Sequence, residues 1–90
     1  MKAIYSIFWK TSAKKELKRI DKSDIPKIIS AIEELSKDPF PANTKKYSGT
    51  NHTYRIRVGD YRVIYSILKD ILTIEVIKVG HRKDVYRKSK

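Results

Sequence analysis

Residues 54–65, YRIRVGDYRVIY, alternate between polar and apolar side chains on either side of a Gly-Asp pair. This alternation is typical of two half-buried strands, and a two-residue loop led by glycine is a common hairpin connection because glycine supplies the positive φ of the first loop position. With Gly59 and Asp60 as the loop, Arg57 lies opposite Arg62, and opposed side chains share one face of the sheet. The apolar face then carries Tyr54, Ile56, Val58, Tyr61, Val63 and Tyr65, and the other face carries Arg55, Arg57 and Arg62.

The three arginines on one face of this hairpin indicate an anion-binding site. Like charges directly opposite one another destabilise a sheet, so a purely solvating face would avoid placing Arg57 opposite Arg62. Guanidinium suits phosphate because its planar fork donates two parallel hydrogen bonds and stays charged. The alternative is that the arginines only keep the edge of a sheet solvated. We favour the anion site because of the opposed pair.

Composition favours a single small domain that meets a polyanion. Ninety residues suffice for one core over 1–90, and the chain has no cysteine to form a disulfide framework. The net charge is +11, and the part after residue 38 holds 12 basic and 4 acidic side chains. Such a charge is typical of nucleic-acid binding, with an acidic protein as the second candidate partner. No apolar stretch suits a signal peptide or a membrane span, so we expect a soluble, cytoplasmic protein that does not bind membranes.

The spacing of apolar residues predicts the remaining elements. They are a strand at 3–9, helices with apolar stripes over 13–20 and 25–35, an irregular connection over 39–51, the hairpin, and a last strand at 71–79. The order β-α-α-β-β-β predicts an α+β fold, with two N-terminal helices packed on one face of a small antiparallel-rich sheet. The arginine face is expected to stay uncovered. Counting across a turn at Lys69-Asp70 places Ile77 beside Arg62 and Glu75 beside Ile64.

The polar segment after the last predicted strand holds three further candidates. Beside an arginine face, Arg82 would be a phosphate ligand, His81 a proton carrier, and Tyr86 a base-stacking or proton-transferring ring. The alternative is a solvated basic end. The sequence has neither the spacing of metal ligands nor a glycine-rich phosphate loop, so we expect no metal and no cofactor.

Two runs of sequence are specific in combination, namely residues 54–65 and VGHRKDVY at 79–86. Together they resemble the RelE/ParE superfamily of toxin–antitoxin toxins, and the RelE branch in particular. SAKKEL at 12–17 resembles the first helix of that family, and KKYSG at 45–49 resembles its Lys-Leu-x-Gly connection. The resemblance covers nearly the whole chain.

The resemblance implies a ribosome-dependent endoribonuclease that cuts messenger RNA in the A site and is blocked by a RelB-like antitoxin. The ribosome and its messenger RNA are then partners. In that family, two basic residues on the second strand, an arginine on the third, and an arginine and a tyrosine near the C-terminus form the active site. The matching positions here are Arg55, Arg57, Arg62, Arg82 and Tyr86.

The chain departs from the family where protons would move. Some relatives carry lysine in place of Arg55 and Arg57, and lysine can transfer protons in a way that arginine cannot. His81 also stands where some relatives have lysine, and the link from it to Tyr86 is shorter than theirs. The identity of the general base is therefore left open.

The chemistry that the resemblance implies is attack of an RNA 2′-OH on the adjacent phosphodiester, without a metal. Arg57 and Arg62 would stabilise the developing charge, while Arg55 and Arg82 would position the backbone. Further RNA contacts are expected from Lys45, Lys46, Lys83 and Arg87. Two alternatives are a ParE-like toxin that inhibits gyrase and a module that binds RNA or the ribosome without cutting.

Overall fold

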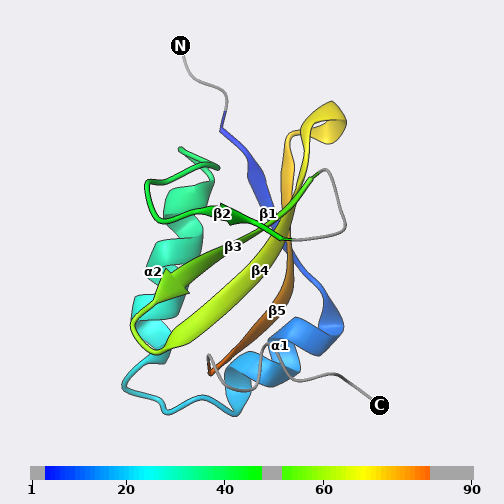
Figure 1. The fold of residues 1–90 in the computed structure, drawn as a ribbon. Coiled ribbons are helices and arrows are strands. Elements are labelled where there is room, and N and C mark those ends of the chain that lie inside the picture. Colours follow the sequence, from blue (N-terminus) through cyan, green and yellow to red (C-terminus); the bar gives the residue numbers. More distant parts are fainter. Residues whose placement is uncertain (1–3, 48–51, 82–90) are drawn as a thin grey trace.

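The computed structural model describes residues 4–47 and 52–81, and within them two helices lie on one face of a five-stranded mixed sheet (Figure 1). The elements are β1 (Ser6–Trp9), α1 (Thr11–Lys18), α2 (Ile25–Leu35), β2 (Lys45–Lys46), β3 (Thr53–Val58), β4 (Tyr61–Leu68), the 3₁₀ turn η1 (Lys69–Ile71) and β5 (Thr73–His81). The strand order is β1-β5-β4-β3-β2, with β1 parallel to β5 and every other pair antiparallel. The predicted α+β class and the two helices on one face are confirmed.

One strand was not predicted. The sequence of residues 39–51 indicated an irregular connection, whereas Lys45 and Lys46 form β2 and pair with Arg55 and Tyr54 of β3. A strand of two residues is too short to show an alternating pattern, so it forms through its pairing with β3. The element order is therefore β-α-α-β-β-β-β.

The hairpin of β3 and β4 has the predicted register. Arg57 pairs with Arg62, and Tyr54 pairs with Tyr65 at the far end. Gly59 has a φ of +59°, which glycine adopts at little cost because it has no Cβ. The Gly-Asp loop therefore fixes which side chains share each face.

The predicted register of the last strand is wrong. Arg62 pairs with Gly80, and Ile64 pairs with Lys78. The connection is longer than the predicted turn at Lys69-Asp70, because η1 is followed by Leu72 in the left-handed region at φ 47°. The register also shifts between Ile64 and Tyr65, which leaves Ile77 as an extra residue in β5.

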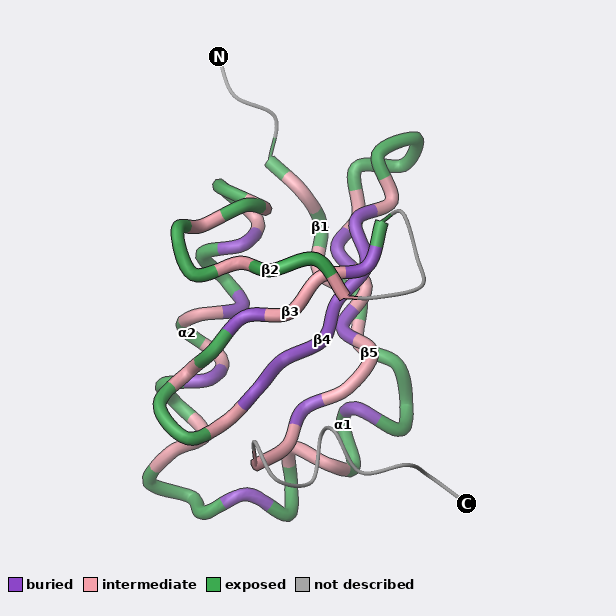
Figure 2. The backbone as a smooth tube through the Cα atoms, in the orientation of Figure 1, coloured by how far each residue is buried: buried purple, intermediate pink, exposed green. Residues whose placement is uncertain are grey.

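The core lies between the helices and one face of the sheet (Figure 2). Figure 2 shows β4, the central strand, buried along most of its length. The buried apolar side chains include Ala13 of α1, Ile28, Ile32 and Leu35 of α2, and Ile56, Val63, Tyr65, Ile67, Ile74, Val76 and Val79 of the sheet. Within residues 4–47 and 52–81, neither helix has the length and apolar composition of a membrane span.

Tyr65 links this core to the segment that precedes β2. Its side chain is fully buried, and its hydroxyl donates a hydrogen bond to the Pro39 carbonyl oxygen at 2.6 Å. Burial raises the pKa of Tyr65 to about 12, because the phenolate would lose its hydration. The tyrosines of the apolar hairpin face therefore belong to the core, with Tyr54 and Tyr61 packed at its margin.

Candidate functional site

The candidate site is a pocket on the sheet face opposite the helices. Its volume is ≈ 240 Å³. It is lined by Asn43, Lys45, Arg55, Arg57 and Arg62. Four of these five side chains are cationic at neutral pH, so the pocket favours an anion.

Strand pairing places these cations in two rows across the sheet. The first row runs from Lys45 through Arg55 and Ile64 to Lys78 of β5. The second row runs from Arg57 through Arg62 to Gly80. The predicted gathering of the three hairpin arginines is confirmed.

Arg62 lies deeper than expected. The arginine face was expected to be uncovered, and neither helix within the described residues covers it, yet Arg62 is only 7% exposed. It belongs to the central strand, and its Nη1 donates a hydrogen bond to the Tyr61 carbonyl oxygen at 3.3 Å. Arg57 is exposed, and Arg55 is intermediate. The three guanidiniums therefore form a graded site, with Arg62 at its base and Arg57 at its rim.

Asn43 is a member of the pocket that sequence reasoning missed. Its Nδ2 donates a hydrogen bond to the Arg57 carbonyl oxygen at 2.9 Å, which ties the segment before β2 to the hairpin. An asparagine between prolines and lysines is typical of a turn, so its sequence context pointed to nothing else. Lys78 ends the first row but does not line the pocket. Its place in that row was missed as well, because the register predicted for β5 placed other residues beside the hairpin.

The two lysines of β2 lie on opposite faces of the sheet. Lys45 pairs with Arg55 and lines the pocket. Lys46 pairs with Tyr54, so its side chain belongs to the other face. The structure thus brings Lys45 to the arginines and leaves Lys46 apart from them.

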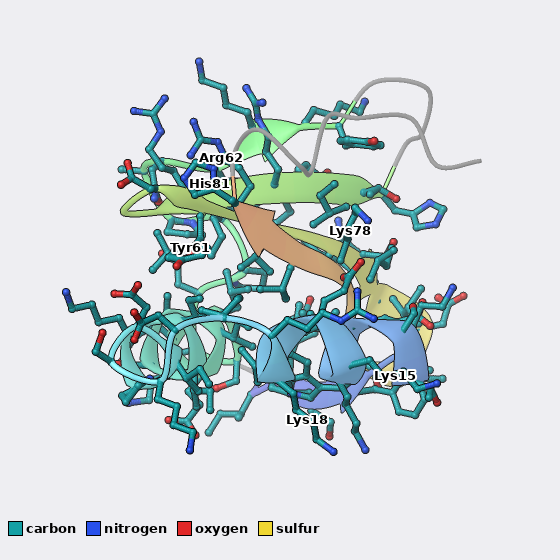
Figure 3. The ribbon with its side chains drawn as sticks, turned by 90° about the horizontal axis from the view of Figure 1, so that it is seen from below. Lys15, Lys18, Tyr61, Arg62, Lys78 and His81 are labelled. Carbon is teal, nitrogen blue, oxygen red and sulfur yellow. The ribbon has the colours of Figure 1, made fainter. Side chains whose placement is uncertain are left out.

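His81 lies at the end of β5, against Tyr61 rather than within the pocket. The two residues pair in the sheet, and their rings meet edge to face at a centroid distance of 5.9 Å (Figure 3). The Tyr61 hydroxyl donates a hydrogen bond to Asp24 Oδ2 at 3.0 Å, and this bond raises the pKa of Tyr61. The structure therefore groups His81 with an aromatic and acidic cluster next to Arg62, and its role in proton transfer stays a prediction.

The other predicted site residues, Arg82, Lys83, Tyr86 and Arg87, lie outside the described residues. Within the described part of the chain, no group of three or more His, Asp or Glu side chains could hold a metal ion. The described pocket offers clustered guanidiniums, which bind phosphate and stabilise negative charge.

Comparison with known proteins gives consistent matches along the chain. A family model described as the ParE toxin of the type II toxin–antitoxin system, parDE, matches residues 7–86. A relative named RelE1 from Methanocaldococcus jannaschii is 33% identical over 76 residues, which cover 81% of this chain and 84% of the relative. Toxin RelG from Mycobacterium tuberculosis is 28% identical over 89 residues, which cover 93% of this chain and 98% of that toxin.

Solved structures show the same fold. The archaeal RelE–RelB complex from Pyrococcus horikoshii includes a chain that is 26% identical with a TM-score of 0.75, covering 90% of this chain and 98% of its own length. The RelB–RelE complex from Methanococcus jannaschii gives 29% identity and a TM-score of 0.74, covering 92% and 99% respectively.

Proposed function

The chain belongs to the RelE/ParE superfamily of type II toxin–antitoxin toxins, and on this premise we propose that it cuts messenger RNA in the A site of the ribosome. The observation that supports this proposal is the pocket of ≈ 240 Å³ into which Arg55, Arg57 and Arg62 converge. Three guanidiniums on one small surface repel one another, and a phosphodiester at the centre relieves that repulsion.

The proposed reaction is attack of the RNA 2′-OH on the adjacent phosphorus. The 2′-OH gives its proton to a general base as the new P–O bond forms, and negative charge grows on the phosphoryl oxygens. The leaving 5′-oxygen takes a proton from a general acid as its bond to phosphorus breaks. Arg62, at the base of the pocket, and Arg57, at its rim, stabilise the charge on the phosphoryl oxygens. Arg55 and Lys45 bind the flanking phosphates.

The positive charge for this step comes from the protein side chains. Fixed guanidiniums supply the electrostatic stabilisation that a metal ion supplies in many other nucleases, so the proposed reaction needs no metal. His81, Arg82 and Tyr86 remain the proposed sources of proton transfer and of a further phosphate contact. Lys46, Lys83 and Arg87 are proposed to make further contacts with RNA.

A RelB-like antitoxin is the proposed protein partner. The solved relatives from Pyrococcus horikoshii and Methanococcus jannaschii are described as complexes of RelE with RelB. With a net charge of +11, this chain should bind a small acidic protein that covers the pocket. Covering the pocket would block RNA from the arginines.

Primer extension on a translated message tests the proposal. A message is translated with and without the purified chain, and the same message is incubated with the chain in the absence of ribosomes. We expect cuts within codons only when ribosomes are present, because the ribosome holds the message in the geometry for in-line attack. Equal cutting of free RNA, or no cutting in either reaction, would contradict the proposal.

Inhibition of gyrase is the second candidate function, because the matching family model describes a ParE toxin. A supercoiling assay with purified gyrase separates the two. We expect supercoiling to proceed unchanged at concentrations of the chain that stop translation.

A further inference from the structure

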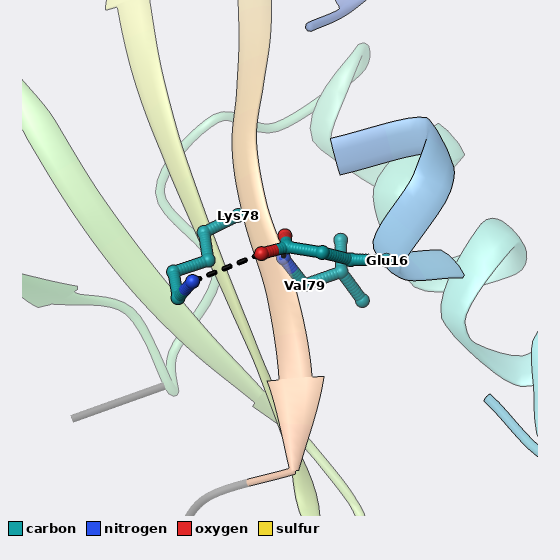
Figure 4. Close-up of polar contacts among 3 residues, drawn as sticks. All are labelled: Glu16, Lys78 and Val79. Carbon is teal, nitrogen blue, oxygen red and sulfur yellow. Dashed lines mark hydrogen bonds and ion pairs between the residues drawn. The ribbon is translucent and has the colours of Figure 1, made fainter. Parts of the chain in front are cut away.

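Glu16 of α1 makes two contacts with β5 that the proposed chemistry does not use. Its Oε2 accepts a hydrogen bond from Lys78 Nζ at 2.9 Å, which is also an ion pair, and its Oε1 accepts one from the Val79 backbone N–H at 3.0 Å (Figure 4). The carboxylate therefore binds one side chain and one backbone group of neighbouring residues on the same strand.

These contacts lie just beyond the point where β1 stops pairing with β5. β1 pairs with β5 as far as Trp9 opposite Val76, and the Lys10 N–H then donates to the Val76 carbonyl oxygen at 3.1 Å. Val79 lies beyond that point, is only 2% exposed, and directs its N–H toward α1. A buried N–H without an acceptor is costly, so the Glu16 carboxylate takes the place of the missing strand.

The end of β5 that Glu16 holds, residues 78–81, forms part of the surroundings of Arg62. This contact of Glu16 with β5 is called the clamp below. The extra residue Ile77 shifts the register of β5 just before Lys78, and such a bulge bends a strand. The residues after the bulge include Gly80, which pairs with Arg62, and His81, which packs on Tyr61. The position of this segment against α1 therefore determines what lies beside the base of the pocket.

We propose that Glu16 is a positioning residue for RNA cleavage, because it holds the end of β5 against α1 and so keeps Gly80 and His81 in place beside Arg62 and Tyr61. Lys78 binds the second carboxylate oxygen and orients the first oxygen toward Val79. This inference rests on the proposed function, and it adds a residue of α1 that does not touch the RNA.

Two variants of Glu16 separate the parts of the clamp. Glu16→Gln keeps an oxygen that can accept the Val79 hydrogen bond but loses the ion pair with Lys78. Glu16→Leu loses both contacts at similar side-chain size. Glu34→Gln is the matched control, because Glu34 is exposed on α2 and the substitution changes net charge equally.

The first measurement is amide hydrogen exchange by NMR on the free protein. We expect Glu16→Leu to speed the exchange of the Val79 amide by roughly tenfold or more, since its acceptor is gone. The Gly80 and His81 resonances should shift in that variant. Glu16→Gln should retain most of the protection, and Glu34→Gln should match wild type. Unchanged Val79 exchange in Glu16→Leu would overturn the inference.

The second measurement is cleavage on translating ribosomes, well below the Tm of each variant. A positioning role predicts that Glu16→Leu lowers kcat by roughly tenfold with little change in KM, since misplacement of catalytic groups costs rate rather than binding. Glu16→Gln should recover most of kcat. Wild-type kcat in Glu16→Leu, with cutting by the wild-type protein intact, would overturn this inference alone. A wild-type protein that does not cut would overturn the proposed function and with it the role of Glu16 in cleavage, while the exchange measurement would still report on the clamp.

Discussion

Arg57 and Arg62 face each other across the hairpin, but they differ in how far their side chains are exposed to solvent. Arg57 is exposed, so its side chain is available to a ligand and contributes little to the core. Arg62 is buried and hydrogen-bonded to the Tyr61 carbonyl oxygen. A substitution at Arg57 therefore tests the chemistry alone, whereas a substitution at Arg62 tests chemistry and packing together.

The two arginines should differ in a paired mutational test. Arg57→Ala should reduce ribosome-dependent cleavage by about 10²-fold or more, because one positioned donor to the developing charge is lost, and its Tm should match wild type. Arg62→Ala should reduce cleavage at least as much and also lower Tm, because it empties a buried site, while Arg62→Lys should recover part of the activity. Lys27→Ala on the exposed face of α2 is the control. Full activity in Arg57→Ala would contradict the role of Arg57 in stabilising the developing charge.

Tyr65 predicts how stability changes at alkaline pH. Its folded-state pKa of about 12 lies above its ordinary value of 10.0, so the folded state favours the protonated phenol. This contribution is fully present below pH 10 and is lost as the pH rises through the folded-state pKa. The free energy of unfolding should therefore fall between about pH 10 and 12.

Denaturant titrations across this pH range check the Tyr65 prediction. Tyr65→Phe should be less stable at neutral pH, since the hydrogen bond to Pro39 is lost, and should fall less steeply between about pH 10 and 12. Equal slopes for wild type and Tyr65→Phe would contradict the assignment.

Among the helices and strands, the sequence pattern predicted those whose structure depends on residues close together in the sequence. The Gly-Asp pair and the alternation over 54–65 gave the register of β3 against β4, because a two-residue loop leaves no freedom in the pairing. The stripe over 25–35 predicted α2 in the same way. β2 could not be predicted, because two residues are too few to show a periodic pattern. The register of β5 depends on a bulge and on a left-handed Leu72, and the sequence pattern predicts neither.

The residues of the candidate site also differ in how far the sequence predicts their positions. The three arginines were predictable because they sit on one hairpin whose register is local. Asn43 lines the pocket from the segment before β2, and the position of that segment depends on tertiary pairing. The side on which His81 lies depends on the register of β5, so its contact with Tyr61 could not be foreseen.

Gly59 and Leu72, two loop residues with left-handed backbone conformations, should respond oppositely to substitution. Gly59 has a φ of +59° with open space around it, so Gly59→Ala should lower the free energy of unfolding by about 1 kcal/mol through backbone strain alone. Leu72 has a φ of 47° and is 44% exposed, so Leu72→Gly should relieve strain and raise that free energy by up to about 1 kcal/mol. Urea denaturation of both variants checks the signs. The same sign for both substitutions would contradict this account of the two loops.

Across the molecule, the packing of the helices and the distribution of positive charge both favour anion binding on the same face of the sheet. Both helices of the described residues lie on one face of the sheet, and the cations that line the pocket lie on the opposite face (Figure 3). Within a chain of net charge +11, this arrangement directs a polyanion toward β3 and β4.

The same charge predicts how the antitoxin behaves. A small acidic protein encoded beside this chain should bind it and restore growth of cells that express it, because charge complementarity speeds association and the complex covers the pocket. Affinity should fall as salt rises, since exposed charges are screened. Co-expression and titration at two salt concentrations measure both effects. A neighbour that neither binds nor restores growth would contradict the prediction.

In the proposed mechanism, the pocket binds the phosphate at the cut while the RNA supplies its own nucleophile. The most direct test is a translated message with one 2′-deoxyribose 5′ of the mapped cut, compared with the same message carrying the deoxyribose elsewhere. We predict that the first message binds the ribosome and the protein but is not cut at that position, while the control is cut to a 2′,3′-cyclic phosphate and a 5′-hydroxyl. Efficient cutting at the deoxy-substituted position would contradict the account.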